Sequence, residues 1–267
     1  MSGIRIGAHV DQEDPLAEAA DRGADVVQFF LGPPQSWKGP KVAYAGGAEA
    51  LKARAADDDV QLFVHSPYPM NIPTLNNRIR IPSRKLLQQH LNAAAEIGAR
   101  GLIVHGGHLT VDDDAAIGFD NWRKCIERAE LPIPLLIENT AGGDNPMARH
   151  LDQIARLWDA VQSADNEHVD RVGFCLDTCH FHAGGEELAT VVDRVKAITG
   201  RIDLVHANGS RDEFDSGADR HSNFDAGHID PMDIVHVVRE AGAPVVVETP
   251  NADNGQKADI DFLRSNL

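Results

Sequence analysis

Short apolar segments recur along the chain and alternate with longer segments whose apolar residues follow a helical spacing. The short segments are rich in β-branched residues, which is typical of strands covered on both faces. Their alternation with helical segments predicts a parallel sheet. The strands are expected at residues 4–9, 25–29, 61–65, 101–105, 135–138, 172–177, 203–206 and 244–248.

Amphipathic stretches between these segments predict helices. In residues 83–97, Leu87, Leu91 and Ala94 lie on one side at helical spacing, and Ser83 is the expected N-cap. Eight strands with intervening helices predict an α/β fold, a single (β/α)8 TIM barrel forming one domain over residues 1–267. An open doubly wound sheet is the less favoured alternative. The other helices are expected at residues 15–22, 147–161, 188–198 and 231–241.

The composition is compatible with this fold. A length of 267 residues suits a barrel that typically takes about 250. The chain has 42% hydrophobic and 25% charged residues, which is typical of a globular protein. No apolar run approaches the roughly 20 residues needed to cross a bilayer, and the first residues lack the features of a secretion signal. We therefore expect a cytoplasmic protein without a membrane partner.

The three cysteines, Cys125, Cys175 and Cys179, are too few for a disulfide scaffold. A reducing compartment fits this content best. Cys175 and Cys179 could serve as metal ligands, but small buried side chains near a strand end are the favoured interpretation.

The net charge of −16 is unusual for a protein that binds nucleic acid, because phosphate contacts usually come from Lys and Arg. The charge therefore disfavours broad electrostatic binding to DNA. An acidic site filled with metal ions would, however, concentrate positive charge where a phosphate could dock. Composition leaves nucleic-acid binding open.

Metal-type ligands stand at the ends of six successive expected strands. In a barrel of this kind, side chains at the C-terminal strand ends converge on one face. Burying six ionisable groups there without compensation would be very costly, and metal coordination supplies the compensation. The candidates are His65, His105, Glu138, Asp177, His206 and Glu248.

Two further positions add ligands. His180 lies three residues after Asp177, in the loop that must follow that strand. Asp219 and His221 alternate, so an extended backbone would point both side chains the same way. Imidazole and carboxylate ligands suit zinc and, less specifically, manganese or iron. Nine protein ligands are too many for one ion and suit two or three.

Longer motifs around these residues resemble endonuclease IV, the zinc-dependent apurinic/apyrimidinic endonuclease family. The resemblance runs nearly end to end and rests on GAHV, HSPYPMN, VHGGH, IENTAGG, CLDTCH, HANGS, DRH and VETP, which occur in the family's order. It implies three Zn²⁺ ions, with Mn²⁺ as an alternative at one or more sites. His65, His105 and Glu138 would hold one ion. Glu138 would bridge to a second, held also by Asp177, His206 and Glu248, and His180, Asp219 and His221 would hold the third.

The resemblance also implies an activity in base excision repair of DNA. Family members hydrolyse the phosphodiester 5′ to an abasic site in double-stranded DNA, leaving a 3′-hydroxyl and a 5′-deoxyribose phosphate, and many trim blocked 3′ ends. The nucleophile would be a water molecule whose pKa the metal lowers. Glu138 would be the catalytic residue that orients this water as well as bridging two ions. We expect a monomer.

DNA contacts are expected from loops on the same face. Extrusion of the target nucleotide is the expected route to the scissile bond, with Tyr68 stacking beside it. For Trp37, packing on the barrel rim is an equal alternative. The positions that match DNA-contacting positions of the family, or flank them, are Gln35, Trp37, Tyr68, Asn71 and Arg220.

The chain departs from the family pattern in these loops. Gln35 and Ser36 stand where many members carry Arg-Gln, so a cationic wedge is missing. Gly209 replaces an Asp, and Phe224-Asp225 replaces Ile-Gly. None of these changes removes an expected metal ligand. They concern how tightly, and with what preference, DNA is held.

The principal alternative is a divalent-metal sugar isomerase or epimerase of the related xylose-isomerase-like barrels. Such enzymes need one or two ions and a pair of proton-transfer carboxylates. The net charge of −16 and the altered loops favour this alternative. The trio His180, Asp219 and His221 has no purpose in it. A non-catalytic zinc-buffering or damage-binding protein is less favoured, because a decayed site would not retain a complete ligand set.

Overall fold

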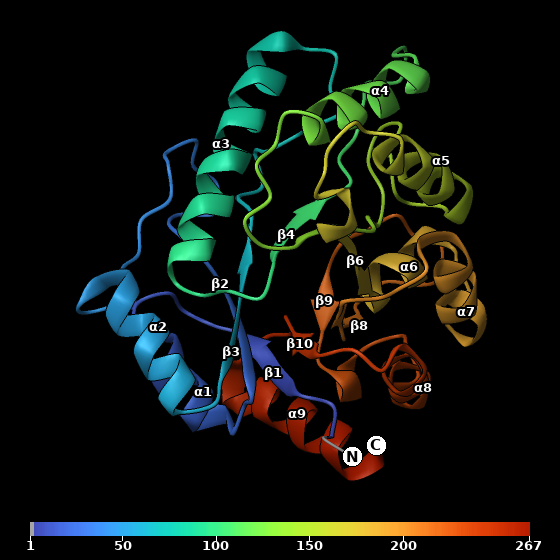
Figure 1. The fold of residues 1–267 in the computed structure, drawn as a ribbon. Helices are drawn as coiled ribbons and strands as arrows, with labels where there is room; N and C mark the ends of the chain where they lie inside the picture. Colours follow the sequence, from blue (N-terminus) through green and yellow to red (C-terminus); the bar gives the residue numbers. More distant parts are fainter. Residues whose placement is uncertain (1–2) are drawn as a thin grey trace.

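The expected strands form a closed parallel barrel. The computed structural model describes residues 3–267, and the strands follow one another around the barrel in the order β1-β10-β7-β6-β5-β4-β3-β2 (Figure 1). This arrangement confirms the predicted TIM barrel. The strands are β1 (Ile6–His9), β2 (Val26–Phe30), β3 (Gln61–His65), β4 (Leu102–His105), β5 (Leu135–Glu138), β6 (Val172–Asp177), β7 (Leu204–His206) and β10 (Val245–Val247).

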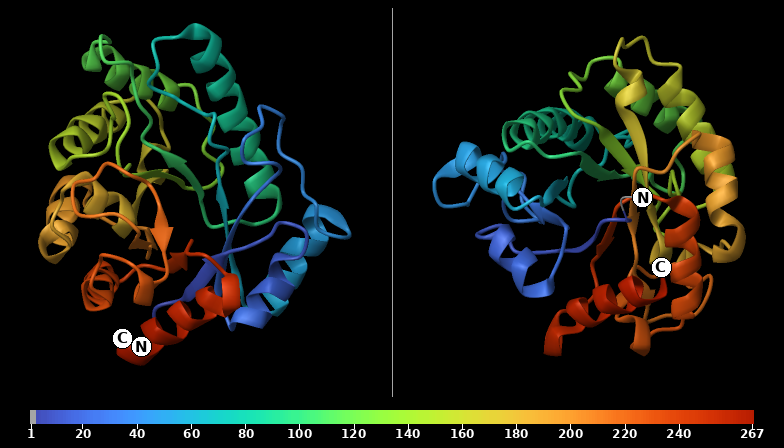
Figure 2. Two further views of the ribbon diagram at one scale, coloured as in Figure 1. Left: turned by 180° about the vertical axis from the view of Figure 1, so that it is seen from behind. Right: turned by 60° about the horizontal axis from the view of Figure 1, so that its bottom comes forward.

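Helices surround this barrel, and the views in Figure 2 show them on its outer side. The C-terminal helix α9 packs beside β1 and α1, where the barrel closes. Within the described residues, no helix is both long enough and apolar enough to span a membrane. The helices are α1 (Pro15–Arg22), α2 (Gly47–Asp57), α3 (Asn77–Glu96), α4 (Ala115–Ile126), α5 (Leu151–Gln162), α6 (Thr178–Gly184), α7 (Leu188–Thr199), α8 (Pro231–Ala241) and α9 (Gly255–Asn266).

The loops between the barrel strands and helices contain a short hairpin and three short 3-10 helices. A two-stranded antiparallel hairpin, β8 (Gly209–Ser210) with β9 (His221–Ser222), follows β7. It encloses the loop that carries Asp219. The short 3-10 helices are η1 (Val169–Arg171), η2 (Phe224–Ala226) and η3 (Ala252–Asn254).

Helix α3 begins earlier than the sequence predicts. Asn76 is its N-cap and accepts a hydrogen bond from the backbone of Arg78. Pro82 lies inside the helix, although proline removes a backbone hydrogen bond there and usually marks a helix start or break. Ser83, the expected N-cap, is buried, and its hydroxyl donates to the carbonyl oxygen of Ile79 at 2.8 Å. The prediction of Ser83 as a cap was therefore wrong.

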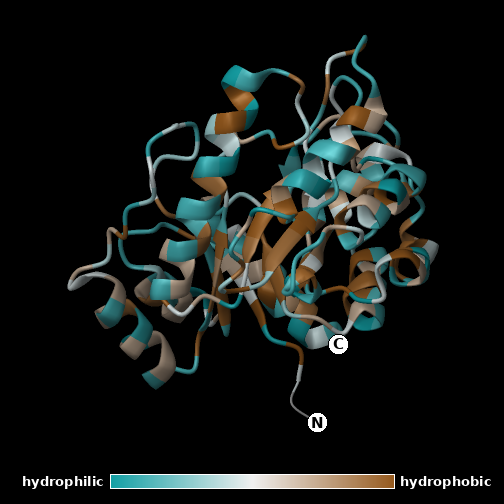
Figure 3. Ribbon diagram, turned by 45° about the horizontal axis from the view of Figure 1, so that its top comes forward, coloured by the Kyte–Doolittle hydropathy of each residue, from teal (hydrophilic) through white to brown (hydrophobic). Residues whose placement is uncertain are grey.

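Apolar side chains fill the inside of the barrel. They come from seven of its strands and form a cluster separate from the larger core between barrel and helices. Figure 3 shows hydrophobic strands at the centre and hydrophilic residues on the surrounding helices. We call these residues the interior cluster; they are Val26, Phe63, Ile103, Leu136, Cys175, Leu204 and Val246.

Gly7 on β1 tests how tightly this barrel is closed. A Cβ atom at Gly7 would lie 1.6 Å from the carbonyl oxygen of Val26 on β2, and the two residues are paired in register. Because backbone atoms of a barrel cannot shift alone, we expect Gly7→Ala to lower the free energy of unfolding by about 3 kcal/mol or more. Urea denaturation measures this change. Gly3→Ala is the control, because nothing lies within 4 Å of the added carbon; similar stabilities for both variants would contradict the prediction.

Candidate metal centre

A ring of polar side chains lies directly above the interior cluster. Side chains of a strand alternate between its two faces, so residues two positions after the interior cluster also face inward, at the carboxyl end of the barrel. His65 follows Phe63 in this way, and Glu138 follows Leu136. We call these residues, with His9 at the end of β1, the strand-end ring; they are His9, Gln28, His65, His105, Glu138, Asp177, His206 and Glu248.

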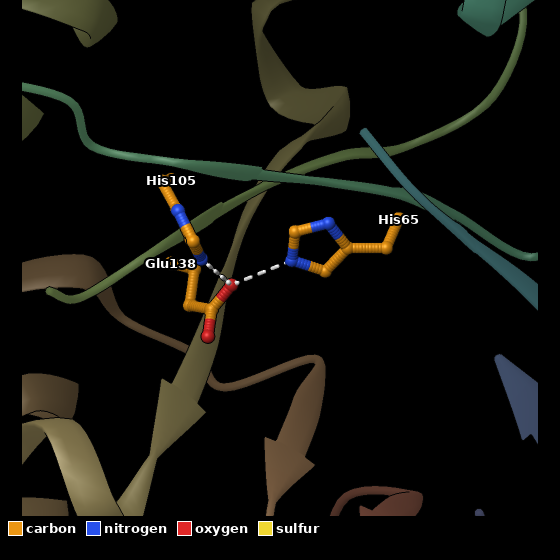
Figure 4. A group of neighbouring side chains, drawn as sticks. All are labelled: His65, His105 and Glu138. Carbon is orange, nitrogen blue, oxygen red and sulfur yellow. Dashed lines mark hydrogen bonds and ion pairs between the residues drawn. The ribbon is translucent and has the colours of Figure 1, made fainter. Parts of the chain in front are cut away.

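The first group of candidate ligands comprises His65, His105 and Glu138. The Nε2 atoms of His65 and His105 lie 3.2 and 3.3 Å from the same carboxylate oxygen, Oε2 of Glu138. Figure 4 shows the two rings directed at this oxygen. The Nδ1 atom of His65 is 2.7 Å from the carbonyl oxygen of Ser66. Donation of its proton there leaves the Nε2 lone pair facing the group.

The second group comprises Glu138, Asp177, His206 and Glu248. The Nδ1 atom of His206 lies 3.0 Å from Oε1 of Glu138, 3.3 Å from Oε2 of Glu248 and 3.8 Å from Oδ2 of Asp177. Three carboxylates thus gather around one imidazole nitrogen. Such a concentration of buried negative charge is costly unless a cation compensates it.

The third group comprises His180, Asp219 and His221. Oδ1 of Asp219 lies 3.1 Å from Nε2 of His180 and 3.2 Å from Nε2 of His221. Both Nε2 atoms are buried, and among the described residues neither has a hydrogen-bond partner of acceptable geometry. Two nitrogens and one oxygen that approach each other without hydrogen bonding are the donor set that a metal ion would satisfy. The residues therefore fit a metal centre.

Local structure orients the third group. The carboxylate of Asp177 caps helix α6 and accepts from the backbone of His180 at 2.7 Å. The Nδ1 atom of His180 lies 2.8 Å from the carbonyl oxygen of Asn139, so its Nε2 atom faces Asp219. An ion pair of 2.7 Å between Arg149 and Asp215 anchors the loop that carries Asp219. As expected, Asp219 and His221 bring their side chains to one place, with Oδ1 of Asp219 3.2 Å from Nε2 of His221.

Charges in the three groups shift each other's pKa values. Burial opposes ionisation of Glu138, but the facing charges of His206 and His105 hold its pKa well below the usual value. Burial also opposes protonation of His221, yet the close approach of the Asp219 carboxylate and the charge of Asp177 raise its pKa to about 9. A bound cation would replace protons on such imidazoles, because metal ligands must be deprotonated.

Sequence reasoning missed three buried amides beside these ligands. Asn208 donates to Asp177 at 2.7 Å, and its carboxamide oxygen accepts from the backbone of Glu248 at 2.7 Å. Asn139 exchanges two hydrogen bonds with the backbone of Asp177. Gln28 lies in the strand-end ring itself. Each was visible in the sequence only as a polar residue in, or just after, an apolar segment.

Two of the expected DNA contacts, Tyr68 and Trp37, have exposed side chains. Tyr68 stacks over His105, with ring centroids 6.2 Å apart and an interplanar angle of 23°. It lines a pocket of about 290 Å³ together with His105, His180 and Asp219. Trp37 is also exposed and lines a separate groove beside α3. Both side chains are therefore accessible to a macromolecule.

The other expected contacts and altered positions lie as follows. Gln35 is exposed and Ser36 is half-buried in the loop after β2. Asn71 is buried, and its carboxamide donates to the carbonyl of His108 and accepts from its backbone N–H. Arg220 is exposed and forms an ion pair with Asp212.

The remaining altered positions lie in and after the hairpin. Gly209 is buried in β8. Phe224 is buried against Phe262, whereas Asp225 is exposed. Phe224 therefore packs within the protein, and Asp225 alone of this pair reaches the surface.

The chain belongs to a known class of barrel. It matches the family model described as a xylose isomerase-like TIM barrel over residues 16–266. A protein of Mycobacterium tuberculosis named "Probable endonuclease 4" is 56% identical over 259 residues, which cover 97% of each chain. Within this class, the chain belongs to the endonuclease 4 family, which confirms the resemblance seen in its motifs.

Solved structures agree with this assignment. The crystal structure of endonuclease IV from Thermus thermophilus matches with a TM-score of 0.81 and 26% identity, covering 98% of both chains. A D-tagatose 3-epimerase-like protein matches with a TM-score of 0.73 and 17% identity, covering 98% of this chain and 95% of the other. The second likeness shows the fold alone.

Cys179 lies close to the candidate metal centre. Its sulfur lies within 4.8 Å of candidate ligand atoms of Asp177 and His221. Burial raises its pKa to about 12 in the absence of a metal ion, so deprotonating this thiol costs more than using the nearby imidazoles and carboxylates. We therefore expect Cys179→Ala to retain as many metal ions as the wild-type protein, measured by elemental analysis. Cys125→Ala, at another buried thiol, is the control; loss of an ion from the Cys179 variant alone would show that the sulfur is a ligand.

Proposed function

We propose that this protein is a metal-dependent DNA repair endonuclease that hydrolyses the phosphodiester 5′ to abasic sites in double-stranded DNA. The products would be a 3′-hydroxyl and a 5′-deoxyribose phosphate. Membership of the endonuclease 4 family supports the class of activity. The observation that carries the proposal is the convergence of three metal-type groups at one barrel mouth, joined through the buried carboxylate of Glu138.

We propose three zinc ions, one in each group. Nitrogen and oxygen donors without a thiolate suit zinc, and manganese could replace it at one or more positions. When bound, such ions supply Lewis-acid stabilisation of the phosphate and lower the pKa of an attacking water. Glu138 is placed to serve two groups at once, because Oε2 faces the first group and Oε1 faces the second.

The remaining residues would bind and orient DNA. The pocket beside Tyr68 has about 290 Å³, which suits a small group such as an extruded deoxyribose phosphate. Tyr68 would stack beside that group, and Trp37, Gln35 and Arg220 would contact the flanking duplex. Asn71 would act through His108, because its amide is already bonded to that backbone.

A sugar isomerase or epimerase is the alternative function, and the shared fold of the epimerase-like structure is compatible with it. That chemistry needs one or two ions and leaves His180, Asp219 and His221 without a role. The ion count and the substrate therefore separate the two functions.

Removal of the metal tests the proposal directly. We expect purified protein to incise a duplex that contains one abasic site, and prolonged chelation to reduce incision to background, because the three groups would then lack their cations. Gel analysis of a labelled strand measures this, with re-addition of Zn²⁺ and a duplex without the lesion as controls. No incision together with about one ion per chain would instead favour the isomerase.

Glu138→Gln tests the shared carboxylate. A neutral amide cannot hold two cations as a carboxylate can. Even the loss of a group that only hydrogen-bonds a metal ligand lowers metal affinity or activity by about 10–100-fold. We therefore expect incision to fall by more than about 100-fold while binding to abasic DNA largely survives. Single-turnover incision and a filter-binding assay measure the two effects. Glu167→Gln, at a side chain that is 88% exposed, is the control; near-normal incision by Glu138→Gln would contradict the assigned role.

A further inference from the structure

Gln28 is an uncharged member of the strand-end ring. It lies on β2 two residues after Val26 of the interior cluster, so its side chain faces the same space as the candidate ligands. The residue is completely buried, with 0% exposure. A carboxamide at such a depth is costly unless its polar atoms are paired. The hydrogen-bond partners of this carboxamide therefore indicate its role.

Each polar atom of Gln28 meets a residue at the second group. Oε1 lies 2.8 Å from Nε2 of His206. Nε2 lies 2.7 Å from Oε1 of Glu248 and 2.9 Å from Nδ1 of His9. A carboxamide offers one acceptor oxygen and two N–H donors. These three contacts use all of its hydrogen-bonding groups.

The carboxylate of Glu248 fixes which way the amide points. An ionised carboxylate only accepts hydrogen bonds, so the NH2 group of Gln28 must face Glu248. The amide oxygen must then face His206, whose Nε2 atom has to carry a proton. In a neutral imidazole this leaves the lone pair on Nδ1. That Nδ1 atom is the one surrounded by Glu138, Asp177 and Glu248.

Two other candidate ligand imidazoles are held by the backbone. His65 and His180 each face a carbonyl oxygen through Nδ1, at 2.7 and 2.8 Å. His206 depends instead on a side chain, which a single substitution can remove. The hydrogen bond to Oε1 of Glu248 likewise leaves Oε2 facing Nδ1 of His206, at 3.3 Å, where Asn208 also donates to it.

We infer that Gln28 is a positioning residue of the metal centre, which fixes the tautomer of His206 and the orientation of Glu248 for the ion in the second group. The inference rests on the proposed function, because it assigns a role within the same centre. It does not make Gln28 a ligand or a catalytic residue. Groups that orient metal ligands typically change metal affinity by about 10–100-fold when they are lost.

Gln28→Met in the full-length protein tests this role, because methionine keeps an unbranched side chain and removes the amide. We expect one of three zinc ions to bind about 10–100-fold more weakly, while the other two bind as in the wild type. Competition between the protein and a chromophoric chelator measures the affinities. Gln28→Leu is a second variant in case the thioether packs poorly.

Gln256→Met is the matched control. Gln256 is also a buried glutamine, but its NH2 group donates to the backbone carbonyls of His9 and Thr249 rather than to a ligand side chain. We expect this variant to keep wild-type affinity at all three ions. If the Gln28 and Gln256 variants lost zinc affinity equally, or if the Gln28 variant lost affinity equally for all three ions, the inference would be overturned in favour of general destabilisation.

The protonation state of the His206 ring can also be measured by NMR spectroscopy. A purely structural role of Gln28 would leave this signal unchanged. In zinc-loaded protein labelled with ¹⁵N-histidine, we expect His206 to carry its proton on Nε2, and Gln28→Met to lose the hydrogen-bonded signal. Unchanged zinc affinities and an unchanged His206 signal would overturn this inference alone. A wild-type protein that retains no ion in the second group would overturn both this inference and the proposed three-ion centre, so the two failures are distinguishable.

Discussion

The arrangement of the candidate ligands at the carboxyl end of the barrel depends on one completely buried carboxylate, that of Glu138. An isolated charge at this depth would be neutralised by a proton, because burial disfavours ionisation. Four imidazoles prevent this, since His65, His105, His180 and His206 each place a ring nitrogen within 3.3 Å of one of its oxygens. The carboxylate in turn holds the imidazoles together. The geometry of the first two groups, and the place of His180 in the third, follow from this mutual dependence.

The barrel supplies the rigidity that such a cluster needs. The interior cluster fills the space below, and the strand-end ring lies one pleat above it, so apolar packing sets the height of the candidate ligands on the barrel strands. The third group is different, because Asp219 and His221 come from the loop and hairpin after β7. Arg149 and the capped start of α6 restrain that part of the site. The first two groups therefore lie on rigid barrel strands, whereas the third depends on a loop at the same end of the barrel.

The barrel and the clustering of the candidate ligands were predictable from the sequence for the same reason. Apolar β-branched strands end in ionisable residues, and both signals are local. It did not predict where α3 begins, because Pro82 lies within that helix and normally marks a boundary. Gln28 was missed because an uncharged amide carries no titratable signal, although it interrupts an otherwise apolar strand. The bonding of Asn71 to His108 depends on loops 37 residues apart and has no local signature.

The net charge of −16 is consistent with an endonuclease whose phosphate attraction is confined to its metal centre. Arg220 is already paired with Asp212, which leaves less free positive charge on the loop beside the mouth. Under the proposed function, an acidic surface would repel undamaged duplex, whereas clustered cations would attract a phosphate that reaches the mouth. Such a phosphate would belong to a distorted strand, because most of the candidate ligands are buried, namely His65, Glu138, Asp177, His180 and His206. Charge and burial would thus favour damaged over intact DNA without a broad basic surface.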